Sequence, residues 1–166
     1  MRVRAANRLL FDAPRKWLTS GGLGTMGFGL PAALGAAAAC PGTPVVCVSG
    51  EGSFLMNVQE LATAVEERLP VKVLLLDNAS LGMVRQQQDL FWGGRRTAVD
   101  LGASPDWELL ARAFGWSVRS AGDVVADALA ETLAEPGPAL LHVRIAPEAN
   151  CLPMFRPGGA AREMIG

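Results

Sequence analysis

The sequence predicts an α/β domain in which a mostly parallel sheet is flanked by helices on both faces. Two observations support this fold class. Three short runs rich in Val, Leu and Ile, at 44–49, 71–76 and 138–145, have the nearly continuous apolar character of strands buried on both faces. Segments whose apolar residues recur every three or four positions lie between these runs. Strands that alternate with helices are typical of βαβ units and a parallel sheet.

The elements follow one another in a simple order. The first run ends at Gly50, and a helix is expected over 55–69 with Ser53 as its N-cap. The second run ends at Asp77-Asn78. Before the third run we expect a helix at 107–114, a short strand at 116–118 and a further helix at 123–134. The loop around 93–96, which holds two glycines and two arginines, is the best candidate for a mobile segment.

Composition limits the possible functions. The 166 residues are 50% apolar and carry a net charge of −1, which fits one domain with a sizeable core and excludes intrinsic disorder. Without a basic excess, the sequence predicts no nucleic-acid or membrane partner. No run reaches the roughly 18 apolar residues of a membrane span. The three cysteines lack CxxC spacing and are expected to be buried reduced thiols of a cytoplasmic protein, and the single histidine, His142, is expected to be structural.

A glycine motif at Gly22-Leu23-Gly24-Thr25-Met26-Gly27 has the GxGxxG spacing of dinucleotide-binding folds. That fingerprint must follow a strand directly, and the preceding Asp12-Ala13-Pro14-Arg15-Lys16 has no strand character. Small residues that permit tight helix packing explain the motif equally well. The sequence therefore does not favour a nicotinamide-dependent oxidoreductase.

A second group of polar residues follows two neighbouring strands. Glu51 and Asn78 are separated by 27 positions (78 − 51), about one strand–helix–strand unit, so both are expected at the same sheet edge. A carboxylate and an amide oxygen suit Mg²⁺, and the adjoining Gly52 and Ser53 suit a phosphate group. An ordinary strand-end turn would also use Gly, Asn and Ser, and spacing alone leaves the two interpretations about even.

Four motifs in one order decide between these interpretations. Together they closely resemble the C-terminal, thiamine-diphosphate-binding domain of the acetolactate synthase (acetohydroxyacid synthase) large subunit. The motifs are Ser-Gly-Gly-Leu-Gly-Thr-Met-Gly-Phe-Gly-Leu-Pro-Ala-Ala at 20–33, Gly-Ser-Phe-Leu-Met-Asn-Val-Gln-Glu-Leu at 52–61, Leu-Gly-Met-Val-Arg-Gln at 81–86 and Leu-Pro-Met at 152–154. The resemblance covers nearly the whole chain, and it implies thiamine diphosphate and Mg²⁺ as cofactors.

The resemblance also implies a role for individual residues. Glu51, Asn78 and the backbone carbonyl of Ser80 would ligate Mg²⁺, and Met26 would hold the cofactor bent. Met83 and Gln87 would line the substrate pocket. The full set of expected cofactor-binding residues is Gly24, Met26, Gly50, Glu51, Gly52, Ser53, Met56, Asn78, Ser80, Gly82 and Met83. The tail after residue 152 would close over the site.

Three positions depart from the family pattern. Glu51 stands where the family has Asp, and its side chain is longer by one C–C bond, about 1.5 Å, which changes the reach to a cation. Gln87 stands where the family has the Trp that shapes the pocket for the acceptor 2-keto acid. Asp77 replaces the first of two consecutive Asn residues, which is a milder change.

The chain is expected to be one domain over 1–166 that lacks the family's first strand and the loop after it, with the helix that follows that loop at 5–8. The family's activating Glu lies on a separate N-terminal pyrimidine-binding domain, so no catalytic residue is expected in this chain, and the chain alone is expected to be inactive. Its partners would be that domain and 2-keto acids, in a homo- or hetero-oligomer. A subunit of a split 2-keto acid decarboxylase and a non-catalytic remnant are the alternative functions.

Overall fold

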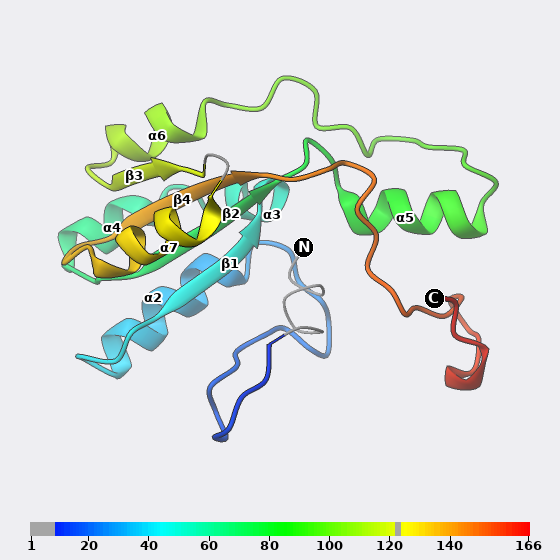
Figure 1. Cartoon of the computed structure of the whole chain (residues 1–166), viewed down its shortest axis with the longest axis horizontal. Coiled ribbons are helices and arrows are strands. Elements are labelled where there is room, and N and C mark those ends of the chain that lie inside the picture. The colour runs from blue at the N-terminus through cyan, green and yellow to red at the C-terminus, as the bar shows by residue number, and fades with distance from the viewer. Residues whose placement is uncertain (1–8, 122–123) are drawn as a thin grey trace.

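The computed structural model describes residues 9–121 and 124–166, and the helix expected at 5–8 lies outside them. The described residues contain one parallel sheet of four strands in the order β1-β2-β4-β3 (Figure 1). The strands are β1 (Val46–Gly50), β2 (Lys72–Asp77), β3 (Ser117–Ser120) and β4 (Ala139–Arg144). All four predicted strands are therefore present, each within one or two residues of its expected start, and the predicted fold class is confirmed.

The helices agree with the sequence prediction less completely. They are α2 (Gly29–Ala39), α3 (Glu51–Leu55), α4 (Glu60–Glu66), α5 (Gly82–Phe91), α6 (Trp107–Ala113), α7 (Val125–Ala134) and the short 3₁₀ helix η1 (Ala161–Glu163). The helix expected over 55–69 is wrong in its boundaries, because the chain forms α3 and α4 with a turn over 56–59 between them. Helix α5 was not predicted.

Two helix starts show why the boundaries differ. Helix α3 begins directly after β1, with Gly50 in an extended conformation as its N-cap, so the prediction of Ser53 as an N-cap is wrong. Ser53 lies inside α3 and its Oγ accepts a hydrogen bond from Gly27 N at 2.9 Å. Helix α6 has a polar N-cap, Asp106, whose carboxylate accepts hydrogen bonds from two backbone N–H groups of the first turn.

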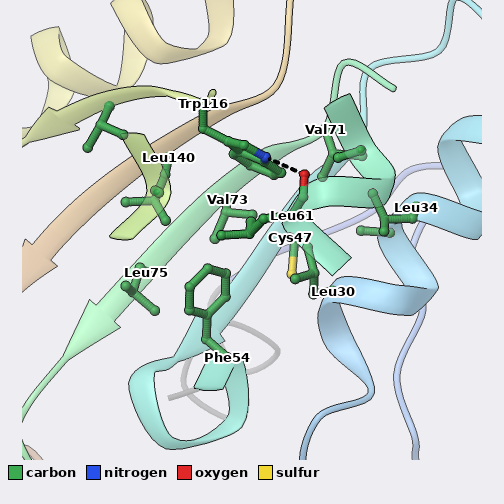
Figure 2. Packing of buried hydrophobic residues seen from close by; sticks show 14 of the residues in the cluster. Leu30, Leu34, Cys47, Phe54, Leu61, Val71, Val73, Leu75, Trp116 and Leu140 are labelled. Atoms are coloured by element: carbon green, nitrogen blue, oxygen red, sulfur yellow. Dashed lines mark hydrogen bonds between the residues drawn. The ribbon is translucent and has the colours of Figure 1, made fainter. Parts of the chain in front are cut away.

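One face of the sheet carries the main apolar core (Figure 2). Side chains alternate between the faces of a strand, and Cys47, Val73 and Leu140 from three strands fall in the same cluster. Helices α2, α3, α4 and α6 cover this face with buried residues that include Leu30, Phe54, Leu61 and Trp107. Trp116 Nε1 donates to the carbonyl of Leu61 at 2.9 Å, so the buried indole is satisfied within the core.

The other face is covered by α7, which packs on β3 and β4. His142 lies buried in β4, and its Nε2 is 3.0 Å from Asp77 Oδ2 on the neighbouring β2, which agrees with a structural role. Cys47 and Cys151 are buried, as expected, but the expectation of burial is wrong for Cys40, which is exposed in the turn after α2. No helix in the described ranges is long and apolar enough to cross a membrane.

Candidate cofactor site

The site lies where β1 and β2 end. The two strands are hydrogen-bonded neighbours with Gly50 opposite Leu76, so the residues that follow them emerge side by side. Glu51 Oε1 accepts hydrogen bonds from the backbone N–H of Ser80 at 2.9 Å and of Asn78 at 3.3 Å. The structure thus brings Glu51 and Asn78 together, as their spacing along the chain predicts, and places Ser80 beside them, as the resemblance implies.

Glu51 is almost completely buried, with 1% of its surface exposed. Burial raises the pKa of its carboxyl group, and the negative charge of Asp77 adds to the rise, while the backbone N–H donors oppose it. Among the described residues, no cationic side chain acts on this carboxyl group, so part of the charge of its ionised form is uncompensated. A bound divalent cation would supply that compensation.

The Asn78 amide completes a set of oxygen ligands. In the orientation that satisfies its neighbours, its nitrogen donates to Glu51 Oε1 at 3.0 Å and to the Ser80 carbonyl at 2.8 Å. A half-turn of the amide puts Oδ1 in the same place, within 2.8–3.0 Å of both oxygens. Adjacent ligands of an octahedral Mg²⁺ with bonds of about 2.1 Å lie about 2.9 Å apart. The donor set therefore fits Mg²⁺ after one amide rotation.

A cavity of about 510 Å³ opens beside these oxygens. Its walls include every expected cofactor-binding residue except Met56, together with Gln87 from the expected substrate pocket. The Met56 side chain is 58% exposed. It lies next to Gly27, because a Cβ added to that glycine would be 3.2 Å from Met56 Cβ. The structure therefore does not place Met56 in the cavity, because the turn over 56–59 carries it outward.

Several cavity residues were not predicted. They are Gly29, Leu81 and Val84, which lie inside predicted motifs, and Val48 and Ser49, which end the predicted strand at 44–49. Gly52 allows Leu81 to pack closely against the backbone of α3, since a Cβ there would lie 2.8 Å from Leu81 Cδ2 and 3.6 Å from Met26 Cε.

Gly27 anchors the glycine motif to the helix beside the cavity. Its φ of +84° favours glycine, and its N–H donates to Ser53 Oγ at 2.9 Å. Asn57 Nδ2 donates to the Gly27 carbonyl at 2.9 Å, a contact that no sequence motif had indicated. These two bonds hold the adjacent Met26 at the cavity wall, where 41% of its surface is exposed.

No strand occurs between residues 9 and 28, which removes the structural context that a dinucleotide fingerprint requires. A parallel sheet with its cavity and polar groups at the carboxyl ends of the strands instead defines an α/β cofactor-binding domain. The sequence profile described as "Thiamine pyrophosphate enzyme, C-terminal TPP binding domain" matches residues 1–143, and the chain belongs to this family. Family membership confirms thiamine diphosphate as the cofactor that the motifs imply.

Similarity to individual proteins agrees with this family. The chain is 49% identical over 158 residues to the acetolactate synthase isozyme 1 large subunit of Escherichia coli K12, which is 93% of this chain and 28% of that protein. It is 48% identical over 163 residues to the isozyme 2 large subunit, covering 97% and 30%. It is 45% identical over 170 residues to chloroplastic acetolactate synthase 1 of Zea mays, covering 97% and 27%. The chain spans less than a third of each of these relatives.

Proposed function

We propose that this chain is the thiamine-diphosphate- and Mg²⁺-binding part of an enzyme of acetolactate synthase type. Such an enzyme decarboxylates pyruvate and transfers the two-carbon unit to a second 2-keto acid, in branched-chain amino-acid biosynthesis. The observation that carries the proposal is the oxygen cluster of Glu51, Asn78 and Ser80 beside the cavity. Identities of 42–49% to acetolactate synthases support it.

The residues of the cavity divide into two groups by chemistry. Glu51, the Asn78 amide oxygen and the Ser80 carbonyl would hold the cation, which in turn would hold the diphosphate. The backbone at Gly50, Gly52 and Gly82 and the hydroxyl of Ser53 would lie against the diphosphate, and Gly24 also lines the cavity. These groups are polar or bare backbone, as binding of a charged group requires.

The second group is apolar and would hold the ring system. Met26 and Met83 lie on the cavity wall as large flexible side chains that exclude water. When bound, the thiamine group would supply a carbon nucleophile that adds to the carbonyl of a 2-keto acid and a cationic ring that takes up the electron pair released by decarboxylation. Gln87 would contact the acceptor 2-keto acid and, as an amide in place of an aromatic ring, would change the acceptor preference.

We further propose that residues 1–166 act as one cofactor-binding domain that needs an N-terminal pyrimidine-binding domain, on the same or another chain. The relatives are more than three times as long as the matched region, which leaves room for that domain. Exposed apolar side chains on and near the glycine motif, among them Leu23 at 93% and Met26 at 41%, suit a covered interface in an oligomer. The activating Glu would come from that domain, so the chain alone would be inactive. A cytoplasmic location follows from the same proposal.

Calorimetric titration of the chain with thiamine diphosphate, with and without Mg²⁺, tests the binding step. We expect Mg²⁺-dependent binding that Glu51→Gln weakens by about 10–100-fold, since one anionic ligand is lost. Glu66→Gln, an exposed position on α4 away from the cavity, is the matched control and should leave binding unchanged. Binding that is indifferent to Mg²⁺ or to Glu51→Gln would contradict the proposal.

The reaction is tested by adding the N-terminal domain of a related acetolactate synthase and pyruvate. Acetolactate as the product, formed only by the mixture, supports both the activity and the need for a partner. Acetaldehyde as the sole product, or activity of the chain alone, would refute the corresponding part of the proposal.

A further inference from the structure

Helix α5 borders the cavity with one set of side chains and buries another set elsewhere. Met83, Val84 and Gln87 line the cavity. Arg85 and Gln86, between them, are polar yet only 4% and 1% exposed. Burial of such groups is unfavourable unless they form hydrogen bonds, so their partners indicate what this part of the helix is for.

The partners of Gln86 lie in the C-terminal tail, 65 residues further along the chain. Gln86 Nε2 donates to the Cys151 carbonyl at 2.9 Å, and Gln86 Oε1 accepts from Cys151 N at 2.7 Å. This pair of bonds satisfies both backbone groups of Cys151, as a neighbouring strand would. Nε2 also lies 3.1 Å from the sulfur of Met154. The side chain therefore attaches the start of the tail to α5.

Other contacts make the tail and α5 one structural unit. Arg85 donates to Asn150 Oδ1 at 2.8 Å. Met154 and Ile165 pair through two backbone hydrogen bonds of 3.0 and 2.7 Å, so the tail folds back on itself. Arg156 lies 5.7 Å from the centre of the Phe91 ring at the end of α5. In Figure 1 α5 and the tail lie together, apart from the sheet.

Within the described part of the chain, no residue of the tail lines the cavity. The expected closure of the tail over the site is therefore not seen as a direct contact. The tail is instead connected to the cavity through α5, a single helix about 15 Å long whose other side chains form the wall.

We infer that Gln86 is a positioning residue that couples the cavity to the C-terminal tail. A ligand that presses on Met83 and Gln87 orders α5, and the two bonds to Cys151 transmit that order to residues 150–165. The inference rests on the proposed function, because the ligand expected at this wall is thiamine diphosphate with its 2-keto acid. Gln86 would not touch either molecule.

Hydrogen–deuterium exchange of the full chain tests this coupling, with Gln86→Met as the main variant. Methionine keeps the length of the side chain and removes both bonds, so we expect exchange at Cys151 to become at least about tenfold faster. Gln88→Met is the matched control, since Gln88 makes the same pair of bonds to the backbone of Thr97 at 3.0 and 3.2 Å. Its effect should be confined to the loop around Thr97.

The decisive readout is the response to thiamine diphosphate and Mg²⁺. In the unchanged chain and in Gln88→Met, the cofactor should slow exchange at Cys151 and Met154. In Gln86→Met the affinity for thiamine diphosphate should stay within about twofold of that of the unchanged chain, while the cofactor should no longer slow exchange at Cys151 and Met154. Loss of stability alone does not produce this combination. Slowing that persists in Gln86→Met, or a tail unaffected by bound cofactor in the unchanged chain, would overturn the inference.

A second variant and a separate measurement keep the outcomes distinct. Gln86→Glu retains one acceptor and places a charge beside the Cys151 carbonyl, so it should release the tail even if Gln86→Met does not fold. Absence of cofactor binding in calorimetry would refute the proposed function and the coupling with it. Even without cofactor binding, comparing exchange at Cys151 in Gln86→Met and Gln88→Met still tests whether Gln86 attaches the tail to α5.

Discussion

The substitution Glu51→Asp tests how this chain accommodates a cation. In the structure the longer glutamate reaches the loop after β2 and accepts two backbone N–H bonds, at 2.9 Å from Ser80 and 3.3 Å from Asn78. Aspartate is shorter by about 1.5 Å and would lose both. A hydrogen bond to a charged group contributes about 1.5–3 kcal/mol, and the 3.3 Å bond contributes less than the other. We therefore expect the free chain to lose about 2 kcal/mol of stability.

Loss of these two hydrogen bonds to residue 51 should favour cofactor binding. Glu51 Oε1, which accepts the two N–H bonds, is also the oxygen beside the Asn78 amide. A cation there competes with the N–H donors, so removing these bonds lowers the cost of binding. If all of the roughly 2 kcal/mol is recovered, affinity for thiamine diphosphate in Mg²⁺ rises about 30-fold, which is the upper limit. The family's Asp at this position agrees with the direction of the effect.

Two measurements on the same variant check this reasoning. Thermal unfolding without ligand should show a melting temperature lower by roughly 4–8 °C for a chain of this size. Calorimetry with Mg²⁺ should show tighter binding of thiamine diphosphate than the unchanged chain shows. An affinity that is equal or weaker despite the lower melting temperature would refute the competition between the N–H donors and the cation.

Three further substitutions have defined outcomes. Trp116→Phe removes the indole hydrogen bond to the Leu61 carbonyl, which keeps its helical donor, and should cost about 0.5–1.5 kcal/mol more in chemical denaturation than Trp107→Phe, whose buried Nε1 has no partner among the described residues; equal losses would contradict this. Gly27→Ala adds a Cβ 2.6 Å from an amide nitrogen at a φ of +84°, so cofactor affinity and melting temperature should both fall, and an unchanged melting temperature would show that the loop relaxes freely. The pKa of Asp89 is lowered, mainly by the side-chain hydrogen bond from Arg96. This ion pair therefore stabilises the fold at pH values above the ordinary carboxyl pKa, and its contribution is lost as the pH falls through the lowered pKa of Asp89. In Arg96→Gln, carbon-detected NMR titration should show the pKa of Asp89 moving up toward its ordinary range, and no movement would refute the pairing.

The strands and the sheet edge were predictable because their physical causes are local. Runs such as 71–76 are apolar except at Lys72, since both faces of the strand are covered, and the position of Asn78 follows from the strand that precedes it. Parallel topology then places Glu51 and Asn78 at one edge. The proximity of Glu51 and Asn78 was therefore predictable without any knowledge of side-chain contacts, whereas the part played by Ser80 was implied only by the family resemblance.

Helix α5 was missed because the positions it buries are polar. Arg85 and Gln86 are buried through hydrogen bonds to residues 65 positions away, so the segment lacks the apolar face by which a helix is detected. The turn over 56–59 was missed for a related reason. Asn57 turns toward Gly27, 30 residues earlier, and this contact cannot be seen in a local pattern.

Several hydrogen bonds to different parts of the chain fix the conformation of the loop after β2, which contains the proposed cation ligands Asn78 and Ser80. Asp77 Oδ1 accepts from Ala79 N at 3.0 Å, and its other oxygen pairs with His142. Ser80 Oγ donates to the Val99 carbonyl at 3.0 Å. Ala79 keeps a φ of +54°, a conformation that persists because the residues on both sides of it are fixed.

If the site binds a cation as proposed, a loop fixed in this way would need little rearrangement. The Ser80 carbonyl and the Asn78 amide would already be in place, and a half-turn of that amide would convert a donor into a ligand. The remaining adjustment falls on Glu51, whose length allows it to satisfy the loop when no cation is present. The identity of residue 51 should therefore set the balance between a stable free chain and tight cofactor binding, with Glu favouring the first and Asp the second.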